Sequence, residues 1–539
     1  MTVFKIIVCR KLNVDSHGTG AYAGDVVSGR RGLENAVSPA RRWLTGLLTF
    51  VLVMAMAPQA VAGPKPMACA DLVKIPLPEV SAVTAELDTD GEAAGMTGLP
   101  EFCRVVLTVK PAIGIEVWLP TGTYNRRFQA VGGGGYAGII SYPAMAGALQ
   151  AGYATASTDT GHQVRDGSFA LGPDGLNHGL VEDFASRSLV ELTKKAKTLI
   201  RAFYGRPAAY SYWNGCSTGG RQGLMLAQRL PDGYDGILAG APAINWDRFI
   251  PAELWPQVVM EQELGAPIAG CKLTAATEAA VAHCDRYDGV ADGLNSDPRR
   301  CDFDAGALVG QSTPCGEFTE ADARVVRAIW AGATTQNGKR LWYGLAKGAP
   351  LGALAGPVPF PITENHHRYW VEQNPNWDWR TLDYAGFTAN FRASQRLFHD
   401  VIGTDDPDLS RFRSSGGRLL MWHGWNDQLI FPEGTVDYYE RVLRQTRGAR
   451  DFARLFMAPG VEHCRGGAGP NTFDMFGELV KWVERDSPAP ERVIASTVDN
   501  GQTVRTRPLC AYPNAARYDG SGSPDSASSF SCGRTSTGH

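Results

Sequence analysis

The chain has 539 residues, of which 44% are hydrophobic and 20% are charged, and its formal net charge is −3. These proportions describe a globular protein and exclude collagen-like, coiled-coil and wholly disordered chains. The near-neutral charge provides no basic surface for nucleic acid, so no nucleic-acid partner is expected. At roughly 150 residues per domain, the length predicts two to four domains, or one large α/β domain with a big insertion.

An apolar run over residues 44–56 follows a pair of arginines and precedes an Ala-Val-Ala sequence that ends at Ala62. This is the layout of a secretory signal peptide cleaved near Ala62. A transmembrane anchor is the alternative, but a bilayer span takes about 20 apolar residues and this run stops at Pro58. We therefore expect a secreted or periplasmic protein with no membrane span after cleavage. The long stretch ahead of the run also suggests a misassigned start codon.

Cleavage near Ala62 would remove one of the 11 cysteines and leave an even number. Disulfides form and persist in oxidising compartments, so five bonds become possible in the mature chain. Parity alone does not assign the partners.

Strands and helices alternate through the first part of the mature chain. Short β-rich runs between Gly, Pro and Asn residues over 105–159 predict successive strands. Apolar residues at helical spacing predict a helix over 182–204, followed by a strand over 209–213 and a helix over 221–229. This alternation predicts a mostly parallel sheet covered on both faces, the core of a doubly wound domain.

The pattern changes after about residue 245, where Trp, Pro, Asn and Asp are frequent and strand periodicity weakens. We interpret this segment as an inserted domain. Alternation resumes with predicted strands over 418–423 and 453–457 and a helix over 473–485, and the last stretch reads as an irregular tail held by a disulfide. The predicted organisation is an extension with signal peptide (1–62), a first core part (63–244), an insertion (245–411) and a second core part with the tail (412–539).

Residues 215–219 read Gly-Cys-Ser-Thr-Gly and fit the pattern G-x-S-x-G between a predicted strand and a predicted helix. In that context the serine lies on a tight turn with its hydroxyl above the sheet, and the glycines avoid crowding their neighbours. The helix directs its N-terminus at a developing oxyanion, to which the Thr218 N–H can donate. We predict Ser217 as a nucleophile; the alternative is a plain glycine-rich turn.

A serine nucleophile needs a base, and with this pattern an acid and then a histidine follow in chain order after late strands. His463 lies in the loop after the predicted strand 453–457 and is the candidate base; a purely structural histidine is the alternative. Asp427, in the sequence WHGWNDQLIFP, is the candidate acid that holds the imidazole tautomer. Its alternative role is to cap a turn. Glu462 is a poor substitute because it adjoins the histidine.

Two cysteines flank these candidates, because Cys216 directly precedes Ser217 and Cys464 directly follows His463. A bond between the cysteines would hold their Cα atoms about 4.4 to 6.8 Å apart. Nucleophile and base would then lie within reach of proton transfer. This adjacency strengthens the prediction for His463.

A run of four glycines over 132–135 follows a predicted strand well before the serine. Acyl transfer needs a second N–H donor from the loop after an early strand, and glycines let the backbone approach a substrate closely. Gly133 or Gly134 is the candidate donor. Neither a G-x-G-x-x-G nor a P-loop lysine pattern is present, so we expect no organic cofactor.

A short loop over 284–294 contains three acids and two glycines in the pattern D-x-x-D-G-x-x-D-G. Calcium prefers carboxylate and carbonyl oxygens, and the glycines allow tight curvature. The loop is no EF-hand, because that spacing and its closing Glu are missing; the alternative is a solvated acidic turn. The candidate ligands are the carboxylates of Asp285, Asp288 and Asp292 and the carbonyls of Val290 and Leu294.

These segments together resemble the tannase and feruloyl esterase family, which also includes the hydrolase of mono(2-hydroxyethyl) terephthalate. The resemblance runs from about Cys69 to Cys532 and rests on the GGGG loop and on GCSTGGRQG, CDRYDGVADGLNSDPRRC, WHGWNDQLI, GVEHCRGG and RPLCAYP. It implies an α/β-hydrolase fold with a large inserted lid domain, a secreted serine esterase with Ser217, Asp427 and His463 as triad, and structural calcium at the acidic loop.

The resemblance also implies a disulfide framework. The four pairs that the resemblance implies leave Cys271 and Cys315 as possible partners of each other. The family leads us to expect a second cysteine soon after Cys315, but the sequence there reads Glu-Phe-Thr, so the partners of Cys271 and Cys315 stay open. The implied bonds are Cys216 with Cys464, Cys69 with Cys103, Cys284 with Cys301, and Cys510 with Cys532.

The expected activity is hydrolysis of carboxylic esters of aromatic acids through an acyl-enzyme, with an apolar slot supplied by the Trp and Phe residues of the lid. Feruloyl, galloyl, p-coumaroyl and terephthaloyl groups all remain open as the acyl group. A non-catalytic binding protein and a secreted peptidase on the same fold are the alternatives. The intact order of Ser, Asp and His argues against the first, and a comparison of amide and ester analogues tests the second.

Overall fold

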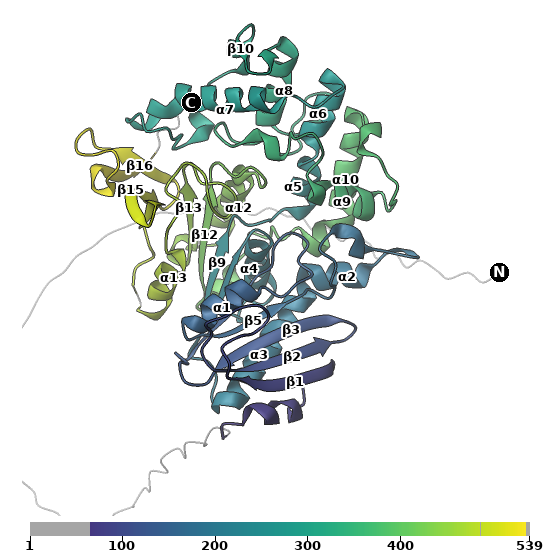
Figure 1. Ribbon diagram of the computed structural model, residues 1–539, viewed down its shortest axis with the longest axis vertical. Helices are drawn as coiled ribbons and strands as arrows, with labels where there is room; N and C mark the ends of the chain where they lie inside the picture. Colours follow the sequence, from purple (N-terminus) through teal and green to yellow (C-terminus); the bar gives the residue numbers. More distant parts are fainter. Residues whose placement is uncertain (1–64, 486, 535–539) are drawn as a thin grey trace, which may run out of the picture. The chain divides into compact units, whose positions relative to one another are not determined.

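The computed structural model describes residues 65–485 and 487–534 (Figure 1). The predicted signal segment and its cleavage near Ala62 lie outside these residues. Within the described ranges, no helix is long and apolar enough to cross a bilayer.

A nine-stranded sheet lies at the centre, in the order β1-β2-β3-β5-β4-β8-β9-β12-β13. Neighbouring strands run parallel from β5 to β13, whereas β1, β2 and β3 form an antiparallel edge that joins β5. The strands are β1 (Val80–Asp88), β2 (Phe102–Val109), β3 (Ile113–Pro120), β4 (Arg127–Val131), β5 (Ala154–Thr158), β8 (Tyr210–Cys216), β9 (Gly236–Gly240), β12 (Arg418–Gly424) and β13 (Ala453–Ala458).

Helices cover both faces of this sheet, because successive strand residues point to opposite sides and both sides are apolar. In β12, Leu419 and Met421 pack with α3, α4 and α12, whereas Leu420 and Trp422 pack with α13 on the other face. The predicted doubly wound α/β core is confirmed. Its helices are α1 (Tyr142–Gln150), α3 (Ser188–Tyr204), α4 (Thr218–Arg229), α12 (Pro432–Gln445) and α13 (Met475–Glu484).

The predicted elements differ from the observed ones mainly at their ends. The helix expected over 182–204 is a π-helical turn (Asp183–Arg187) that continues into α3. The helix expected from 221 begins at Thr218, because the strand β8 passes into α4 through one turn residue.

A helical insertion lies between β9 and β12 and has its own apolar core, to which Trp370 and Phe387 contribute. Tyr136, from the loop after β4, and Phe184, from the turn before α3, belong to the same core, so the insertion packs on loops of the sheet domain. Its helices are α5 (Trp246–Ala252), α6 (Trp255–Leu264), α7 (Gly270–Cys284), α8 (Glu320–Ala331), α9 (Pro361–Asn365), α10 (Tyr384–Ile402) and α11 (Ser410–Ser414).

Small elements complete the chain outside the sheet. A short helix, α2 (His178–Glu182), follows a two-stranded ribbon before α3, and a second such ribbon lies within the insertion. The ribbons are β6 (Leu171–Gly172) with β7 (Gly175–Leu176) and β10 (Ser312–Thr313) with β11 (Gly316–Glu317).

The irregular tail expected near the end of the chain was a wrong prediction. The chain forms two antiparallel ribbons there, β14 (Arg492–Asp499) with β15 (Gln502–Cys510) and β16 (Asn514–Tyr518) with β17 (Phe530–Arg534). Both ribbons keep many exposed polar positions, so they lack the strict apolar alternation by which strands are predicted.

Five disulfides join the ten cysteines of the described chain. Cys271 and Cys315, whose partners the sequence left open, are bonded to each other and link the start of α7 to the turn between β10 and β11. The other four pairs are those that the family resemblance implied: Cys69–Cys103, Cys216–Cys464, Cys284–Cys301 and Cys510–Cys532.

Candidate active site

The candidate nucleophile Ser217 lies on a strained turn between β8 and α4. Its backbone has φ 64° and ψ −127°, a conformation that residues with a side chain rarely adopt. The turn is possible because Gly215 lacks a side chain: a Cβ there would lie 2.5 Å from the backbone of Gly219. The hydroxyl of Ser217 therefore projects from the carboxyl end of the sheet, as the G-x-S-x-G pattern predicted.

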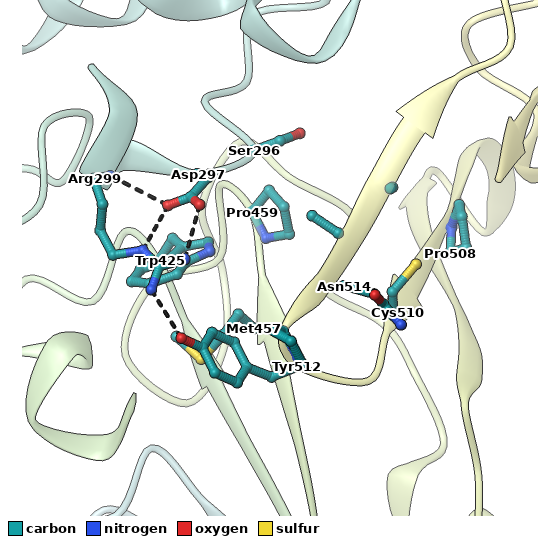
Figure 2. Close-up of a pocket in the computed structure, with 13 residues that line it drawn as sticks. Ser296, Asp297, Arg299, Trp425, Met457, Pro459, Pro508, Cys510, Tyr512 and Asn514 are labelled. Carbon is teal, nitrogen blue, oxygen red and sulfur yellow. Dashed lines mark hydrogen bonds and ion pairs between the residues drawn. The ribbon is translucent and has the colours of Figure 1, made fainter. Parts of the chain in front are cut away.

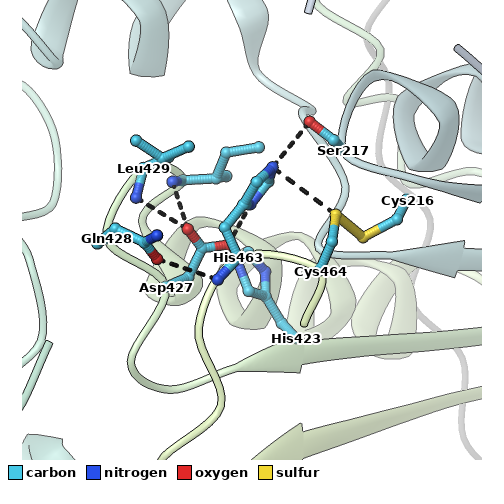
Figure 3. Close-up of a disulfide and its surroundings, with 9 residues drawn as sticks. Cys216, Ser217, His423, Asp427, Gln428, Leu429, His463 and Cys464 are labelled. Atoms are coloured by element: carbon cyan, nitrogen blue, oxygen red, sulfur yellow. Dashed lines mark hydrogen bonds and ion pairs between the residues drawn. A yellow bond between two sulfur atoms is a disulfide. The ribbon is translucent and has the colours of Figure 1, made fainter. Parts of the chain in front are cut away.

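A chain of hydrogen bonds connects the three predicted catalytic side chains (Figure 3). The Ser217 hydroxyl donates to His463 Nε2 at 2.9 Å, and His463 Nδ1 donates to Asp427 Oδ2 at 2.8 Å. Asp427 is an acceptor when ionised, so this arrangement selects the Nδ1–H tautomer of His463. The structure brings together residues that lie far apart in the sequence, in the geometry that serine activation requires.

Asp427 is fully buried and saturated with donors. Its Oδ1 accepts hydrogen bonds from the N–H groups of Leu429 and Ile430 at 2.9 Å each. Its Oδ2 accepts a hydrogen bond at 2.9 Å from a second histidine, His423. Burial alone would raise the pKa of this carboxyl, but His463 and His423 hold the pKa well below its ordinary value. Asp427 thus remains an anion that can stabilise a protonated His463.

The bond between Cys216 and Cys464 tethers the candidate nucleophile to the candidate base (Figure 3). The two Cα atoms are 6.0 Å apart, although 248 positions separate the cysteines in the sequence. Since Cys216 precedes Ser217 and Cys464 follows His463, the bond restricts how far the two reacting side chains can separate.

Backbone donors for an oxyanion lie beside Ser217. Thr218 is the first residue of α4, where backbone N–H groups have no partner within the helix. Of the two glycines that the sequence proposed, Gly133 donates its N–H to Gln222 Oε1 at 3.0 Å, whereas Gly134 lines the cavity in front of Ser217. The geometry therefore favours Gly134 over Gly133 as the second donor.

A cavity of about 360 Å³ opens in front of the Ser217 hydroxyl. Aromatic and aliphatic side chains of the insertion form one side of its wall, chiefly Trp246, Phe249 and Ile250 of α5 and Phe360 beside α9. Leu429 and Ile430, from the Asp427 loop, close another side. The site can therefore hold an apolar, ring-sized group next to the serine.

An arginine anchors the loop that carries Asp427 (Figure 2). Arg299 binds Asp297 at 2.8 Å, donates to the Tyr512 hydroxyl at 3.1 Å and lies 5.1 Å from the Trp425 ring centroid. The cavity among these residues measures only about 20 Å³, which leaves room for little more than a water molecule. This cluster joins the insertion, the Asp427 loop and the C-terminal ribbons.

The acidic loop predicted to bind calcium curls around one of its own carboxylates. Asp285 Oδ1 accepts the N–H groups of Asp292, Gly293 and Leu294 at 2.9 to 3.2 Å. The disulfide between Cys284 and Cys301 closes the loop at its base. Glycine is required at 289, where φ is 99°.

The acids of this loop also crowd one another. Burial raises the pKa of Asp288, and burial raises that of Asp292 to about 6, while each is raised further by the charges of the other loop acids. Arg507 of β15 forms an ion pair with Asp292 and compensates part of this charge. Carboxylate and carbonyl oxygens are the donors that a hard divalent cation prefers, but in the described chain the three loop carboxylates do not form one tight cluster.

Comparison with known proteins identifies the family. The sequence model described as "Tannase and feruloyl esterase" matches residues 96–360 and 358–533. The chain belongs to the tannase and feruloyl esterase family. It is a carboxylic ester hydrolase of that family, and its fold is the α/β-hydrolase fold.

Several relatives are named for the hydrolysis of esters. A "Probable feruloyl esterase" of Arthroderma benhamiae is 40% identical, covering 81% of this chain and 87% of that protein. The "Mono(2-hydroxyethyl) terephthalate hydrolase" of Piscinibacter sakaiensis is 31% identical, covering 84% and 88%. The crystal structure of feruloyl esterase B from Aspergillus oryzae matches with a TM-score of 0.77 and 30% identity, covering 86% of this chain and 99% of that one.

Two residues of the site were not predicted from the sequence. His423, at the end of β12, donates to Asp427, and its position four residues before that acid was the available signal. Glu253, directly after α5, lines the cavity. It is only 1% exposed, and nothing in the sequence marked it as buried.

Proposed function

We propose that the protein hydrolyses esters of aromatic carboxylic acids through a covalent acyl-enzyme on Ser217. The supporting observation is the hydrogen-bonded chain from Ser217 through His463 to Asp427, which faces an apolar cavity large enough for an aromatic ring. The names of the feruloyl esterase relatives support an ester of a phenolic acid, the name of the Piscinibacter sakaiensis relative supports a terephthalate ester, and the family membership supports esterase chemistry.

The proposed reaction has two steps. In the first, Ser217 Oγ attacks the ester carbonyl while His463 Nε2 takes the hydroxyl proton, and Asp427 stabilises the imidazolium. The N–H groups of Thr218 and Gly134 stabilise the oxyanion, and His463 returns the proton to the departing alcohol. In the second step His463 activates water, which releases the acid and regenerates Ser217.

The proposal includes a structural calcium ion held by the carboxylates of Asp285, Asp288 and Asp292 with the carbonyls of Val290 and Leu294. The presence of three partly buried acids in one short loop supports a cation there. The loop lies in the insertion, so the ion would stabilise the fold without taking part in the reaction.

The proposal also includes secretion into an oxidising compartment. Five disulfides in the described chain support it, because such bonds persist outside the reducing cytosol. Detection of the mature N-terminus near Gly63 in the medium or periplasm would test this point.

The deciding experiment measures acid release from methyl gallate, methyl ferulate, methyl p-coumarate and mono(2-hydroxyethyl) terephthalate. Ser217→Ala should abolish turnover of every ester that the wild type cleaves and leave the melting temperature unchanged. Ser312→Ala, at an exposed position of β10, is the matched control and should retain full activity. Full activity of Ser217→Ala would refute the assignment, as would a folded wild type that cleaves none of these esters.

A further inference from the structure

A single acid lines the otherwise apolar part of the cavity that faces Ser217. Glu253 follows α5, whose residues Trp246, Phe249 and Ile250 also line the cavity. Positions 246, 249, 250 and 253 have the spacing of one helix face, so the acid continues the same wall. Its side chain is 1% exposed.

One oxygen of this carboxyl group, Oε2 of Glu253, is buried and has no hydrogen-bond partner in the described chain. The nearby Tyr136 hydroxyl donates instead to the Ile362 carbonyl at 3.1 Å. Burial raises the pKa of Glu253 well above its ordinary value, and the charge of Asp427 adds to the effect. A neutral carboxyl group can both donate and accept a hydrogen bond, and leaving it unpaired in an apolar site is costly.

The position of Glu253 is set relative to the serine by the chain that leads into α5. The Ala243 N–H donates to the Ser217 carbonyl at 3.1 Å, which fixes the start of this segment beside the elbow. From Trp246 to Glu253 the chain advances two helical turns, or about 10 Å at 1.5 Å per residue. The acid therefore belongs to a different turn of the chain from the residues beside the elbow, while it lines the same cavity as Ser217.

We propose that Glu253 binds the phenolic hydroxyl of the acyl ring and thereby selects ring-hydroxylated aromatic acyl groups. This inference rests on the proposed esterase function. A phenol both donates and accepts, which matches the two capacities of a neutral carboxyl group. The contact would satisfy the unpartnered oxygen only when such a substrate is bound.

The same wall disfavours an acyl ring that carries a carboxylate. All residues that line the cavity belong to the described chain, and they include no lysine or arginine. A terephthaloyl carboxylate beside Glu253 would therefore have no lysine or arginine partner in the cavity wall. Burying such a charge unpaired is unfavourable.

The test compares methyl p-coumarate with methyl cinnamate, which differ only in the ring hydroxyl. The wild type should have a kcat/KM for the hydroxylated ester that is higher by about tenfold or more, because a site built to bond a hydroxyl rejects the analogue without it. Glu253→Leu should lower kcat/KM for methyl p-coumarate much more than for methyl cinnamate, and so remove this preference. Glu253→Gln, which keeps a donor and an acceptor, should retain most of the preference. Glu278→Gln, at an exposed acid of α7, is the matched control and should leave kcat/KM for both esters unchanged.

An equal loss on both esters in folded Glu253→Leu would overturn the inference, because a purely structural role lowers both alike. Binding separates this failure from failure of the proposed function. Calorimetry on Ser217→Ala should give tighter binding of methyl p-coumarate than of methyl cinnamate. Adding Glu253→Gln to Ser217→Ala should keep most of this difference in affinity, and adding Glu253→Leu should remove it. If the wild type cleaves no ester, the esterase proposal fails on its own. Equal affinities of the two esters for Ser217→Ala would overturn the role of Glu253.

Discussion

His423 and Asp427 are joined by a hydrogen bond of 2.9 Å, and both side chains are fully buried. Asp427 Oδ2 therefore accepts hydrogen bonds from two histidines, His423 and His463. The hydroxyl of Thr435 donates to His423 Nδ1 at 2.8 Å, which leaves Nε2–H for the carboxylate. This contact fixes the direction in which Asp427 faces His463.

We expect His423→Leu to lower kcat by about 10- to 100-fold, the loss that accompanies removal of a hydrogen bond to a buried charge. His423→Gln keeps an N–H donor and should recover part of the activity, which a merely space-filling role would not explain. The measurement is kcat and KM for one ester that the wild type cleaves, with melting temperatures as a check on folding. Unchanged kcat in folded His423→Leu would show that Asp427 needs no second donor.

The disulfide beside the reacting groups should matter for rate as well as for stability. The double variant Cys216→Ala with Cys464→Ala loses the tether, and misplacement of reacting groups by about 1 Å can cost a hundredfold in rate. We expect its kcat/KM to fall by about 10- to 100-fold. The measurement is kcat/KM at a temperature at which the variant is still folded.

The matched control removes a disulfide whose cysteines do not line the cavity in front of Ser217. Cys510→Ala with Cys532→Ala opens a bond of the C-terminal ribbons, so its melting temperature should fall while kcat/KM stays near the wild-type value. Equal rate losses in the two double variants would mean that Cys216–Cys464 acts only through global stability.

Much of the site could be predicted because its signals are local. Ser217 sits in a five-residue pattern whose glycines are required by backbone contacts, and His463 adjoins a cysteine that pairs with the cysteine beside Ser217. The chain order of serine, acid and histidine then pointed to Asp427. The alternating strands and helices of the core also have local periodicity, so the doubly wound architecture was predictable.

The remaining features depend on contacts in the folded chain that no sequence pattern shows. In the sequence, His423 is a histidine near the end of a predicted strand, and only the folded chain shows its hydrogen bond to Asp427. Glu253 is a polar residue after a short helix, and only the folded insertion shows that it is buried. The choice of Gly134 over Gly133 depends on where Gln222 of α4 places its amide. The C-terminal ribbons were missed because ribbons with exposed polar faces lack a strong strand pattern.

Calcium removal should destabilise the insertion if the acidic loop holds the ion. We expect EDTA to lower the melting temperature and added Ca²⁺ to restore it, since a ligand that binds the folded state stabilises it by mass action. Asp288→Asn should lower the melting temperature and weaken the response to EDTA. Glu317→Gln, at an exposed acid of the same insertion, is the control and should keep the wild-type response. A melting temperature indifferent to EDTA in the wild type would count against the ion.

A buried acid at the end of β5 should make stability depend on pH. Asp159 is 7% exposed and accepts the N–H groups of Gly114 and Gly161 at 2.8 and 2.9 Å. Burial raises its pKa to about 6, against the partial effect of those two donors. The folded chain therefore binds more protons than the unfolded chain between about pH 4 and pH 6. The contribution of Asp159 to the free energy of unfolding falls as pH rises through that window.

We expect Asp159→Asn to abolish this dependence, because an amide keeps an acceptor for the two N–H groups but does not ionise. Relative to the wild type, the unfolding free energy of the variant should increase from pH 4 to pH 7, by at most about 3 kcal/mol. The measurement is the difference in melting temperature between variant and wild type at a series of pH values. Asp174→Asn, at an exposed acid, should show a difference that does not change with pH. If the Asp159→Asn difference were also constant from pH 4 to pH 7, Asp159 would ionise as readily in the folded chain as in the unfolded one, and burial could not be its dominant influence.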